Sequence, residues 1–431
     1  MIKGFKRLIT IALCSAIGAG LGGCSGGASD SIASGQGAAG EAVILPQDKD
    51  GWVATWVGAT LNSSEDILPK SPTLEQSTCR MQFKASLGGE KVRLSFSNEY
   101  GEELLPPGSD MELKSVHIAR LVKPGSPEIV PESDTKVTFS GSESVTIPSG
   151  EIVTSDEIDF VIEDLEYIAV TVSFGSVPEF PACHREADCA SWVSQGEKQG
   201  ESFTPEAWMW SYFSFFRADV WAKAGECSLV CFGDSITDGS VSTFNGFDAW
   251  PDLLAESLIL DGRRISVVNS AIAGNAVTGG WGVAARDRFE RDVISVPGVR
   301  YAVILIGTND IPGAQTDISQ QLIDEYRAMI DACHSHGIKV LAGTITPFMS
   351  NEWWASELHE GIRVSVNDWI MSGDSGFDGY IDFSSALSDP ERPDCLFPEY
   401  DSGDGLHPSV AGHRRMGEAA IEAVGEFLNG L

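Results

Sequence analysis

The sequence predicts a two-part protein, in which an all-β part precedes an α/β part with a parallel sheet and helices on both faces. Short alternating apolar runs fill the first half, from about Gly51 to Lys223, and no helical period of comparable length occurs there. From Cys227 onward, apolar runs of strand length alternate with segments of helical period. A chain of 431 residues is also too long for one ordinary core, so two domains are expected.

The first half reads as a series of short strands that form a sandwich. Met81–Ala85 and Lys91–Ser97 alternate apolar and polar residues, and Gly88-Gly89 between them favours a tight hairpin. The aromatic stretch Trp208–Phe216 fits core and domain packing better than a sugar-stacking platform, although both are open. No pair of a nucleophile and a base is evident in this half.

The second half alternates strands and helices. Ser228–Phe232 and Tyr301–Ile306 are apolar throughout, which is typical of parallel strands that are buried on both faces. A helix is expected from Pro251, which suits a first helical turn, to Gly262, which suits a helix end. A final helix begins at about Ser409.

The N-terminus has the pattern of an export signal. Basic Lys3, Lys6 and Arg7 precede a short apolar segment, and Leu21-Gly22-Gly23-Cys24 resembles a bacterial lipobox with Cys24 as the lipidated residue. An ordinary signal peptide or an uncleaved anchor are the alternatives. We therefore expect a bacterial lipoprotein, at the cell surface or facing the periplasm, in which the membrane is reached through this anchor alone. The expected division is a signal peptide at 1–23, a tether at 24–48, a β-rich domain at 49–225 and an α/β domain at 226–431.

Charge and cysteine usage narrow the classes of partner. The formal net charge of −33 argues against nucleic acid, because phosphate binding needs a basic surface. Seven cysteines follow Cys24, and Cys183 and Cys189, which flank a short polar loop, are the candidate disulfide. No CxxC pair occurs and the histidines do not cluster with cysteines, so a zinc site is not expected.

Residues that can carry chemistry fall where predicted strands end. Gly233-Asp234-Ser235 follows one strand, Asn269–Asn275 another, and Gly307-Thr308-Asn309-Asp310 a third. Asp404-Gly405-Leu406-His407 opens the last helix. Sites of open α/β sheets form beyond the carboxyl ends of the strands, so these segments are expected to meet there.

Together these residues supply what acyl transfer by serine requires. Ser235 is the candidate nucleophile, His407 the base and Asp404 the acid that orients it, with Asp401 as a less well spaced rival. The backbone N–H groups of Ser235 and Gly274 and the amide of Asn309 are the candidate oxyanion donors.

Several other residues near these segments are expected to have other roles. Asp234 and Asp310 are expected to hold loops, and His413 is expected at the surface. Trp353-Trp354 fits either a pocket wall or core and lid packing.

The four segments, in this order and spacing, resemble the SGNH (GDSL) hydrolase family. The stretches Trp52–Trp56, Val92–Asn98 and Asp234–Gly239 are similar to a two-domain bacterial branch of it, which includes arylesterases and acetylesterases of xylanase gene clusters. The resemblance covers nearly the whole mature chain. It implies a three-layer α/β/α esterase domain that needs no metal or cofactor, with the roles assigned above.

We therefore expect a serine esterase that removes short acyl groups, above all acetyl, from carbohydrate or similar esters. Its partner would be a small-molecule or polysaccharide ester. One alternative is a lysophospholipase or thioesterase that acts on lipid esters. Another is a surface glycan-binding protein with an idle hydrolase domain, which the complete set of catalytic residue types disfavours.

Overall fold

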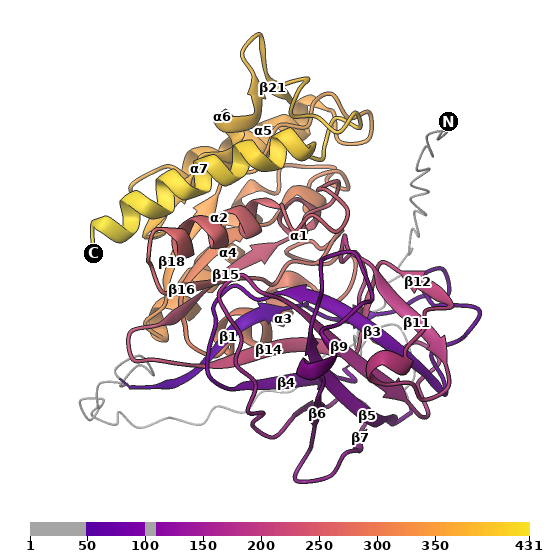
Figure 1. Ribbon diagram of the computed structural model, residues 1–431. Coiled ribbons are helices and arrows are strands. Elements are labelled where there is room, and N and C mark those ends of the chain that lie inside the picture. The colour runs from indigo at the N-terminus through magenta and orange to yellow at the C-terminus, as the bar shows by residue number, and fades with distance from the viewer. Residues whose placement is uncertain (1–48, 100–108) are drawn as a thin grey trace, which may run out of the picture. The chain divides into compact units, whose positions relative to one another are not determined.

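The computed structural model describes residues 49–99 and 109–431, and these described residues belong to one compact unit (Figure 1). The expected signal peptide, tether and lipidation site at Cys24 lie outside the described residues. Within the described ranges, no helix has the length and apolar character needed to cross a membrane.

The β-rich region consists of two main antiparallel sheets. One has the order β1-β14-β4-β8 and the other β12-β11-β3-β9-β5-β6, with β7 paired to β5; a small sheet has the order β13-β10-β2. The strands are β1 (Gly51–Val57), β2 (Leu61–Asn62), β3 (Ser77–Lys84), β4 (Val92–Ser97), β5 (Met111–Arg120), β6 (Thr135–Val137), β7 (Val145–Ile147), β8 (Ile152–Thr154), β9 (Tyr167–Phe174), β10 (Ala182–His184), β11 (Ser191–Gln195), β12 (Ala207–Met209), β13 (Tyr212–Phe213) and β14 (Phe215–Ala222).

The two main sheets share one core, which confirms the sandwich that the sequence predicts. Phe83 of β3 and Phe215 of β14 are fully buried with ring centroids 5.7 Å apart, and Trp56 stacks on Phe215 at 4.5 Å. Burying one such ring contributes about 1.5–3 kcal/mol. The aromatic stretch thus divides: its second half enters the core, while Trp208 and Trp210 remain exposed.

The α/β region has a parallel sheet of order β16-β15-β17-β18-β19. Its strands are β15 (Cys227–Gly233), β16 (Ile265–Asn269), β17 (Val299–Leu305), β18 (Lys339–Gly343) and β19 (Gly379–Ile381). The helices are α1 (Ser235–Asp238), α2 (Trp250–Leu260), α3 (Ala285–Phe289), the π-helix η4 (Glu290–Ile294), the 3₁₀ turn η5 (Thr308–Asp310), α4 (Ser319–Ser335), α5 (Glu357–Ile370), α6 (Phe383–Leu387) and α7 (Val410–Asn429), and a hairpin joins β20 (Ser388–Asp389) and β21 (Arg392–Leu396).

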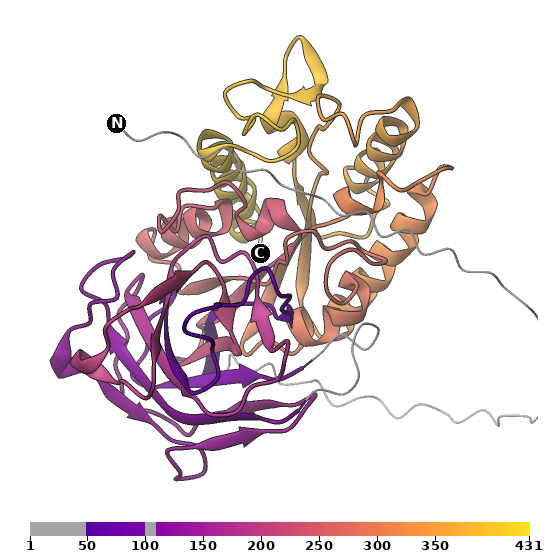
Figure 2. The same cartoon turned by 90° about the vertical axis from the view of Figure 1, so that its right-hand side faces the viewer.

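Alternate residues of β15 enter two different cores, and this produces three layers. Val230 and Phe232 pack with side chains of α3, η4, α4 and α5. Leu229 and Cys231 pack with α2, α6 and α7 on the opposite face. Figure 2 views the sheet close to edge on, with helices on either side. The expected α/β fold class is confirmed, and because β15 lies between β16 and β17, the chain leaves this strand at a topological switch point.

The β-rich and α/β regions interlock along β1. The side chain of Ala54 belongs to the α/β core, and its backbone N–H donates to the Pro297 carbonyl at 2.9 Å. Ser228 of β15 returns a hydrogen bond to the Ala54 carbonyl at 3.2 Å. Strand β1 of the β-rich region therefore also supports the parallel strand β15.

The expected disulfide between Cys183 and Cys189 is wrong: both are buried free thiols. Cys183 pairs through its backbone within the small sheet, opposite Phe213. The Cys189 sulfur lies 2.9 Å from the Tyr212 hydroxyl, so it is already in a hydrogen bond elsewhere. Burial raises the pKa of the Cys189 thiol to about 12, which leaves it as a neutral, poorly reactive thiol.

Candidate active site

Ser235 is the first residue of α1, directly after the parallel strand β15. Asp234 caps this short helix, and its Oδ1 accepts the N–H of Ile236 at 3.1 Å. Gly233 is required before it, because a Cβ there would lie only 2.4 Å from the Leu305 carbonyl of β17. The turn therefore holds Ser235, which is 8% exposed, at the carboxyl end of the sheet.

His407 and Asp404 come from the loop that precedes α7, and they meet Ser235. The Ser235 Oγ lies 2.9 Å from His407 Nε2, and His407 Nδ1 lies 2.6 Å from Asp404 Oδ2. The Asp404 carboxylate accepts a hydrogen bond from Nδ1–H, so the lone pair of Nε2 faces the serine hydroxyl. The three side chains form a relay that can move the hydroxyl proton to the imidazole.

The structure distinguishes Asp404 from its rival Asp401. Asp404 Oδ1 also accepts the backbone N–H groups of Leu406 and His407. Burial raises the pKa of Asp404, but the hydrogen bonds and charge of His407 outweigh it and hold that pKa below its ordinary value. Asp401 Oδ1 instead accepts the N–H groups of Gly403 and Gly405, so it shapes the turn.

The loop after β16 carries Gly274, at a backbone position that favours glycine. Its φ of +76° is left-handed, and a Cβ there would lie 3.0 Å from the Trp281 indole, closer than an ordinary van der Waals contact. Ile272 of the same loop donates its N–H to the Gly233 carbonyl at 3.2 Å, which keeps the loop beside the nucleophile turn.

Asn309 lies in η5, after β17. Its Nδ2 donates to the Asn275 carbonyl at 3.0 Å, which takes one of its two N–H groups. The next residue, Asp310, accepts the backbone N–H groups of Val277 and Thr278, so its expected role in holding a loop is confirmed. Together these bonds tie the Gly274 loop to the end of β17.

A buried arginine that the sequence analysis missed connects these loops through hydrogen bonds. Arg288 of α3 donates to the carbonyls of Gly233 and Ser270 and to the side chain of Asn275, at 3.1, 2.7 and 2.9 Å. Its counter-ion is Asp292, one turn later at 2.9 Å, inside the π-helix η4. Single π-turns of this kind occur often near functional sites.

The Arg288–Asp292 pair also reaches the β-rich region. Asp292 contacts Arg291 as well, and Arg291 pairs with Glu99 at 2.8 Å. Burial raises the pKa of Asp292, but the two arginines outweigh it and lower that pKa. In the sequence, Arg288 and Asp292 look like an ordinary pair one helical turn apart on a solvated face, and the flanking Asp287, Glu290 and Arg291 give no signal that sets this pair apart.

His413 is a correction to the sequence analysis, which placed it at the surface. It is fully buried on α7, and its Nε2 lies 3.0 Å from the carbonyl oxygen of Ser240. The helix turns this face toward the segment that follows α1, so the ring ties α7 to the nucleophile region.

Three tryptophans occupy different positions near these loops. Trp281 is 42% exposed beside Gly274, and the Arg185 guanidinium lies 4.4 Å above its ring. Trp354 is buried and donates from its indole N–H to the Thr308 carbonyl at 3.0 Å, whereas Trp353 is 72% exposed. Of this pair, Trp354 thus packs in the core and Trp353 presents an exposed ring.

A parallel α/β sheet with a Ser–His–Asp relay at the carboxyl ends of its strands is the arrangement of serine-dependent acyl hydrolases as a class. The comparison with families is specific: residues 231–415 match the model of the GDSL-like Lipase/Acylhydrolase family. This part of the chain is a GDSL-like acylhydrolase domain, and the protein is a hydrolase that acts on ester bonds. No curated protein gave a significant match.

Solved structures similar to this chain each match just under half of it. A member of the lipolytic protein G-D-S-L family from Veillonella parvula is 21% identical, covers 46% of this chain and 97% of its own, and has a TM-score of 0.37. A lipase/acylhydrolase from Enterococcus faecalis is 21% identical, with 46% and 94% covered and a TM-score of 0.37. The psychrotrophic esterase EstA from a Pseudoalteromonas species is 14% identical, with 47% and 100% covered and a TM-score of 0.37.

Proposed function

We propose that the protein is an exported, lipid-anchored serine esterase that removes short acyl groups, chiefly acetyl, from carbohydrate or similar esters. The observation that carries the proposal is the continuous relay of 2.9 Å and 2.6 Å hydrogen bonds from Ser235 through His407 to Asp404. Neither a metal nor an organic cofactor has a part in it.

In the proposed reaction, Ser235 Oγ attacks the ester carbonyl carbon while His407 Nε2 takes the hydroxyl proton. The negative charge moves to the carbonyl oxygen, where the N–H groups of Ser235 and Gly274 and the amide of Asn309 donate to it. His407 then returns the proton to the departing alcohol. Water attacks the acyl-enzyme by the same route and releases the acid. Each oxyanion donor typically contributes about 10²–10³ in rate.

The surroundings of Gly274 support a short acyl group. The Trp281 indole lies against this loop and occupies space beside it, which favours acetyl over a long chain. The exposed rings of Trp281 and Trp353 support a sugar as the alcohol part, because exposed aromatic surface near a site is typical of ligand contact. The expected lipobox at Cys24 supports export and anchoring.

The test compares substrates on a soluble form that begins at Glu41. We expect it to release acetate from a chromogenic acetyl ester and from acetylated xylan, and to release little fatty acid from lysophospholipid. Ser235→Ala should lower kcat by about 10³-fold or more, since it removes the nucleophile. Preferential release of fatty acid would contradict the acetyl proposal, and unchanged turnover in the variant would contradict the serine mechanism.

A further inference from the structure

His184, a buried residue of β10, faces two hydrogen-bond acceptors. Its Nδ1 lies 3.0 Å from the carbonyl oxygen of Ala59, and its Nε2 lies 3.2 Å from Asp238 Oδ1. Neither a carbonyl nor a carboxylate can donate, so a ring that bonds both must carry a proton on each nitrogen. The geometry therefore fits the charged imidazolium form, and the side chain is only 8% exposed.

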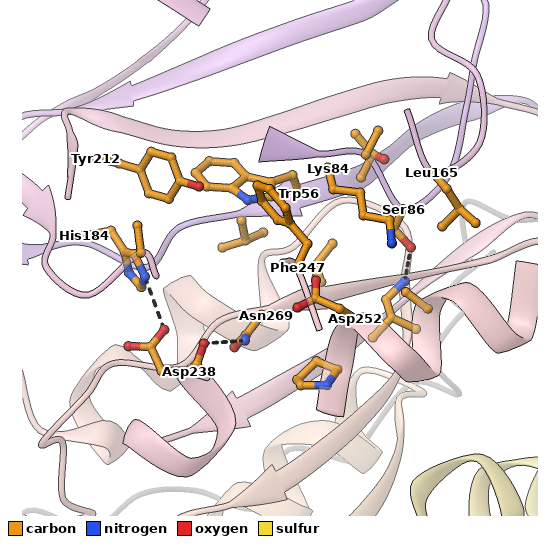
Figure 3. Close-up of a pocket in the computed structure, with 18 residues that line it drawn as sticks. Trp56, Lys84, Ser86, Leu165, His184, Tyr212, Asp238, Phe247, Asp252 and Asn269 are labelled. Atoms are coloured by element: carbon orange, nitrogen blue, oxygen red, sulfur yellow. Dashed lines mark hydrogen bonds and ion pairs between the residues drawn. The ribbon is translucent and has the colours of Figure 1, made fainter. Parts of the chain in front are cut away.

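The groups around His184 come from several elements. Asp238 of α1 and Glu186, just after β10, are negative, and the Tyr212 ring of β13 lies 5.9 Å away. Lys84 of β3 and Asp252 of α2 line the same cavity of about 80 Å³, in which His184 points at Asp238 (Figure 3). Burial lowers the pKa of His184, but Asp238, Ala59 and Glu186 outweigh it and raise that pKa above its ordinary value.

Asp238 also contacts the loop that holds Gly274. It is the last residue of α1, the short helix that Ser235 begins. Its Oδ1 faces His184, while its Oδ2 accepts the N–H of Ala273 at 2.8 Å. Ala273 immediately precedes Gly274. One carboxylate thus connects the β-rich region to the nucleophile helix and to the candidate oxyanion loop.

We propose that His184 is a positioning residue of the esterase: it fixes the Asp238 carboxylate, and Asp238 in turn fixes the Ala273–Gly274 backbone for the oxyanion. The inference rests on the proposed function, in which the Gly274 N–H is an oxyanion donor. His184 contacts no reacting atom in this scheme. The β-rich region then contributes to catalysis through a side chain.

The contact makes positioning depend on pH. The pKa of His184 is higher in the folded state than in the unfolded chain. The stabilisation that the charged ring gives is therefore complete below about pH 6.5, the ordinary pKa of histidine, and is lost as pH rises through the raised pKa. The neutral ring can donate to only one of its two acceptors. We therefore expect an alkaline decline of kcat that belongs to His184.

The test measures how two histidine variants of the full chain hydrolyse a chromogenic acetyl ester. His184→Gln should lower kcat by about tenfold or more, since a misplaced oxyanion donor costs up to about 10²–10³, while KM changes little. The alkaline decline should disappear. The matched control is His117→Gln, because His117 also pairs with an aspartate, Asp134, at 3.0 Å, but on β5.

Counting active sites with a phosphonate ester separates positioning from loss of folded protein. A His184→Gln protein whose kcat per titrated site and alkaline decline match the wild type would overturn the proposal. If that variant does not fold, the ¹⁵N shifts of His184 in the wild-type protein decide: an imidazolium at pH 7 is expected, and a neutral ring would overturn it.

A measurement independent of turnover separates this inference from the proposed function. In a Ser235→Ala background, His184→Gln should speed hydrogen exchange of the Ala273 N–H, and His117→Gln should not. Unchanged exchange would overturn the positioning role. If the wild type hydrolyses no acetyl ester, the proposed function fails, and the exchange result still decides what His184 does.

Discussion

At the scale of single residues, Asp234 is the carboxyl group whose surroundings are the least favourable for its charge. It is fully buried, one oxygen accepts the N–H of Ile236, and the other has no hydrogen-bond partner in the described structure. Burial raises its pKa to about 7, which the Ile236 hydrogen bond and His407 only partly oppose. The residue next to the nucleophile is thus near the point of losing its proton at neutral pH.

This predicts that Asp234→Asn changes stability more at high pH. The folded state keeps the Asp234 proton up to about pH 7, whereas the unfolded chain loses it near pH 3.9, so wild-type stability falls between these values. A three-unit difference corresponds to about 4 kcal/mol at most. Denaturant unfolding should therefore show the variant gaining on the wild type between pH 5 and pH 8.

The matched control is Asp156→Asn. Asp156 is a partly exposed carboxylate that holds a turn through the N–H groups of Ser140 and Gly141, and its pKa is lowered by its hydrogen bonds, chiefly that from Thr138. It is ionised throughout the range from pH 5 to pH 8, so its effect should be constant there. An Asp234→Asn effect that is equally constant would contradict the assigned burial cost.

The residues that meet substrate could be predicted from the sequence because each follows a strand or opens a helix. Ser235, His407 and Asp404 lie within hydrogen-bond reach of one another as expected. The supporting residues could not be predicted, because their partners are far away in the sequence. His184 is 54 residues from Asp238, and nothing in the local pattern of either residue indicates the other.

At the scale of elements, the short helix α3 and the π-helix η4 support the loops of the site. The Arg288 guanidinium donates hydrogen bonds to two backbone carbonyls and one side chain at the ends of β15 and β16. Its positive charge is neutralised by Asp292. Removing one member of such a buried pair leaves an uncompensated charge, which is far more costly than losing a surface pair.

We therefore predict that Arg288→Met lowers the free energy of unfolding by about 3–5 kcal/mol. The reason is that Asp292 and the carbonyls of Gly233 and Ser270 lose a buried donor. The control is Arg286→Met on the same helix, where Arg286 pairs with Glu325 at 2.9 Å in solvent and little change is expected. Denaturant unfolding measures both, and equal effects would contradict the supporting role of Arg288.

The elements themselves were largely predictable, for a physical reason. Buried parallel strands such as β15 and β17 are apolar except near their first residues, where Ser228 and Arg300 lie. The helix α2 begins beside a proline and ends shortly before a glycine, so composition marks these elements. The π-helix was not predictable, because its residues Glu290–Ile294 continue the helical pattern of α3. What distinguishes a π-helix is its backbone hydrogen bonding from i to i+5, which no residue type in this run marks.

At the scale of the whole molecule, the described residues of the β-rich region are part of the same compact unit as the hydrolase region. Ala54 shares the α/β core, Ser86 accepts the N–H of Val267 on β16, and Arg291 pairs with Glu99. The sequence predicted a sandwich and a parallel sheet, and both are present. It could not predict their contacts, because these join residues from 54 positions apart (His184 and Asp238) to 243 positions apart (Ala54 and Pro297) and have no local signature.

The central claim is that Ser235 is the nucleophile of an esterase. The most direct measurement is to inactivate the protein with a chromogenic phosphonate ester and to locate the adduct by peptide mass spectrometry. We predict one adduct per chain, on Ser235, formed in step with the loss of acetyl-ester hydrolysis and absent from Ser235→Ala. Full inactivation with the adduct on another residue, or hydrolysis that survives complete labelling of Ser235, would contradict the account.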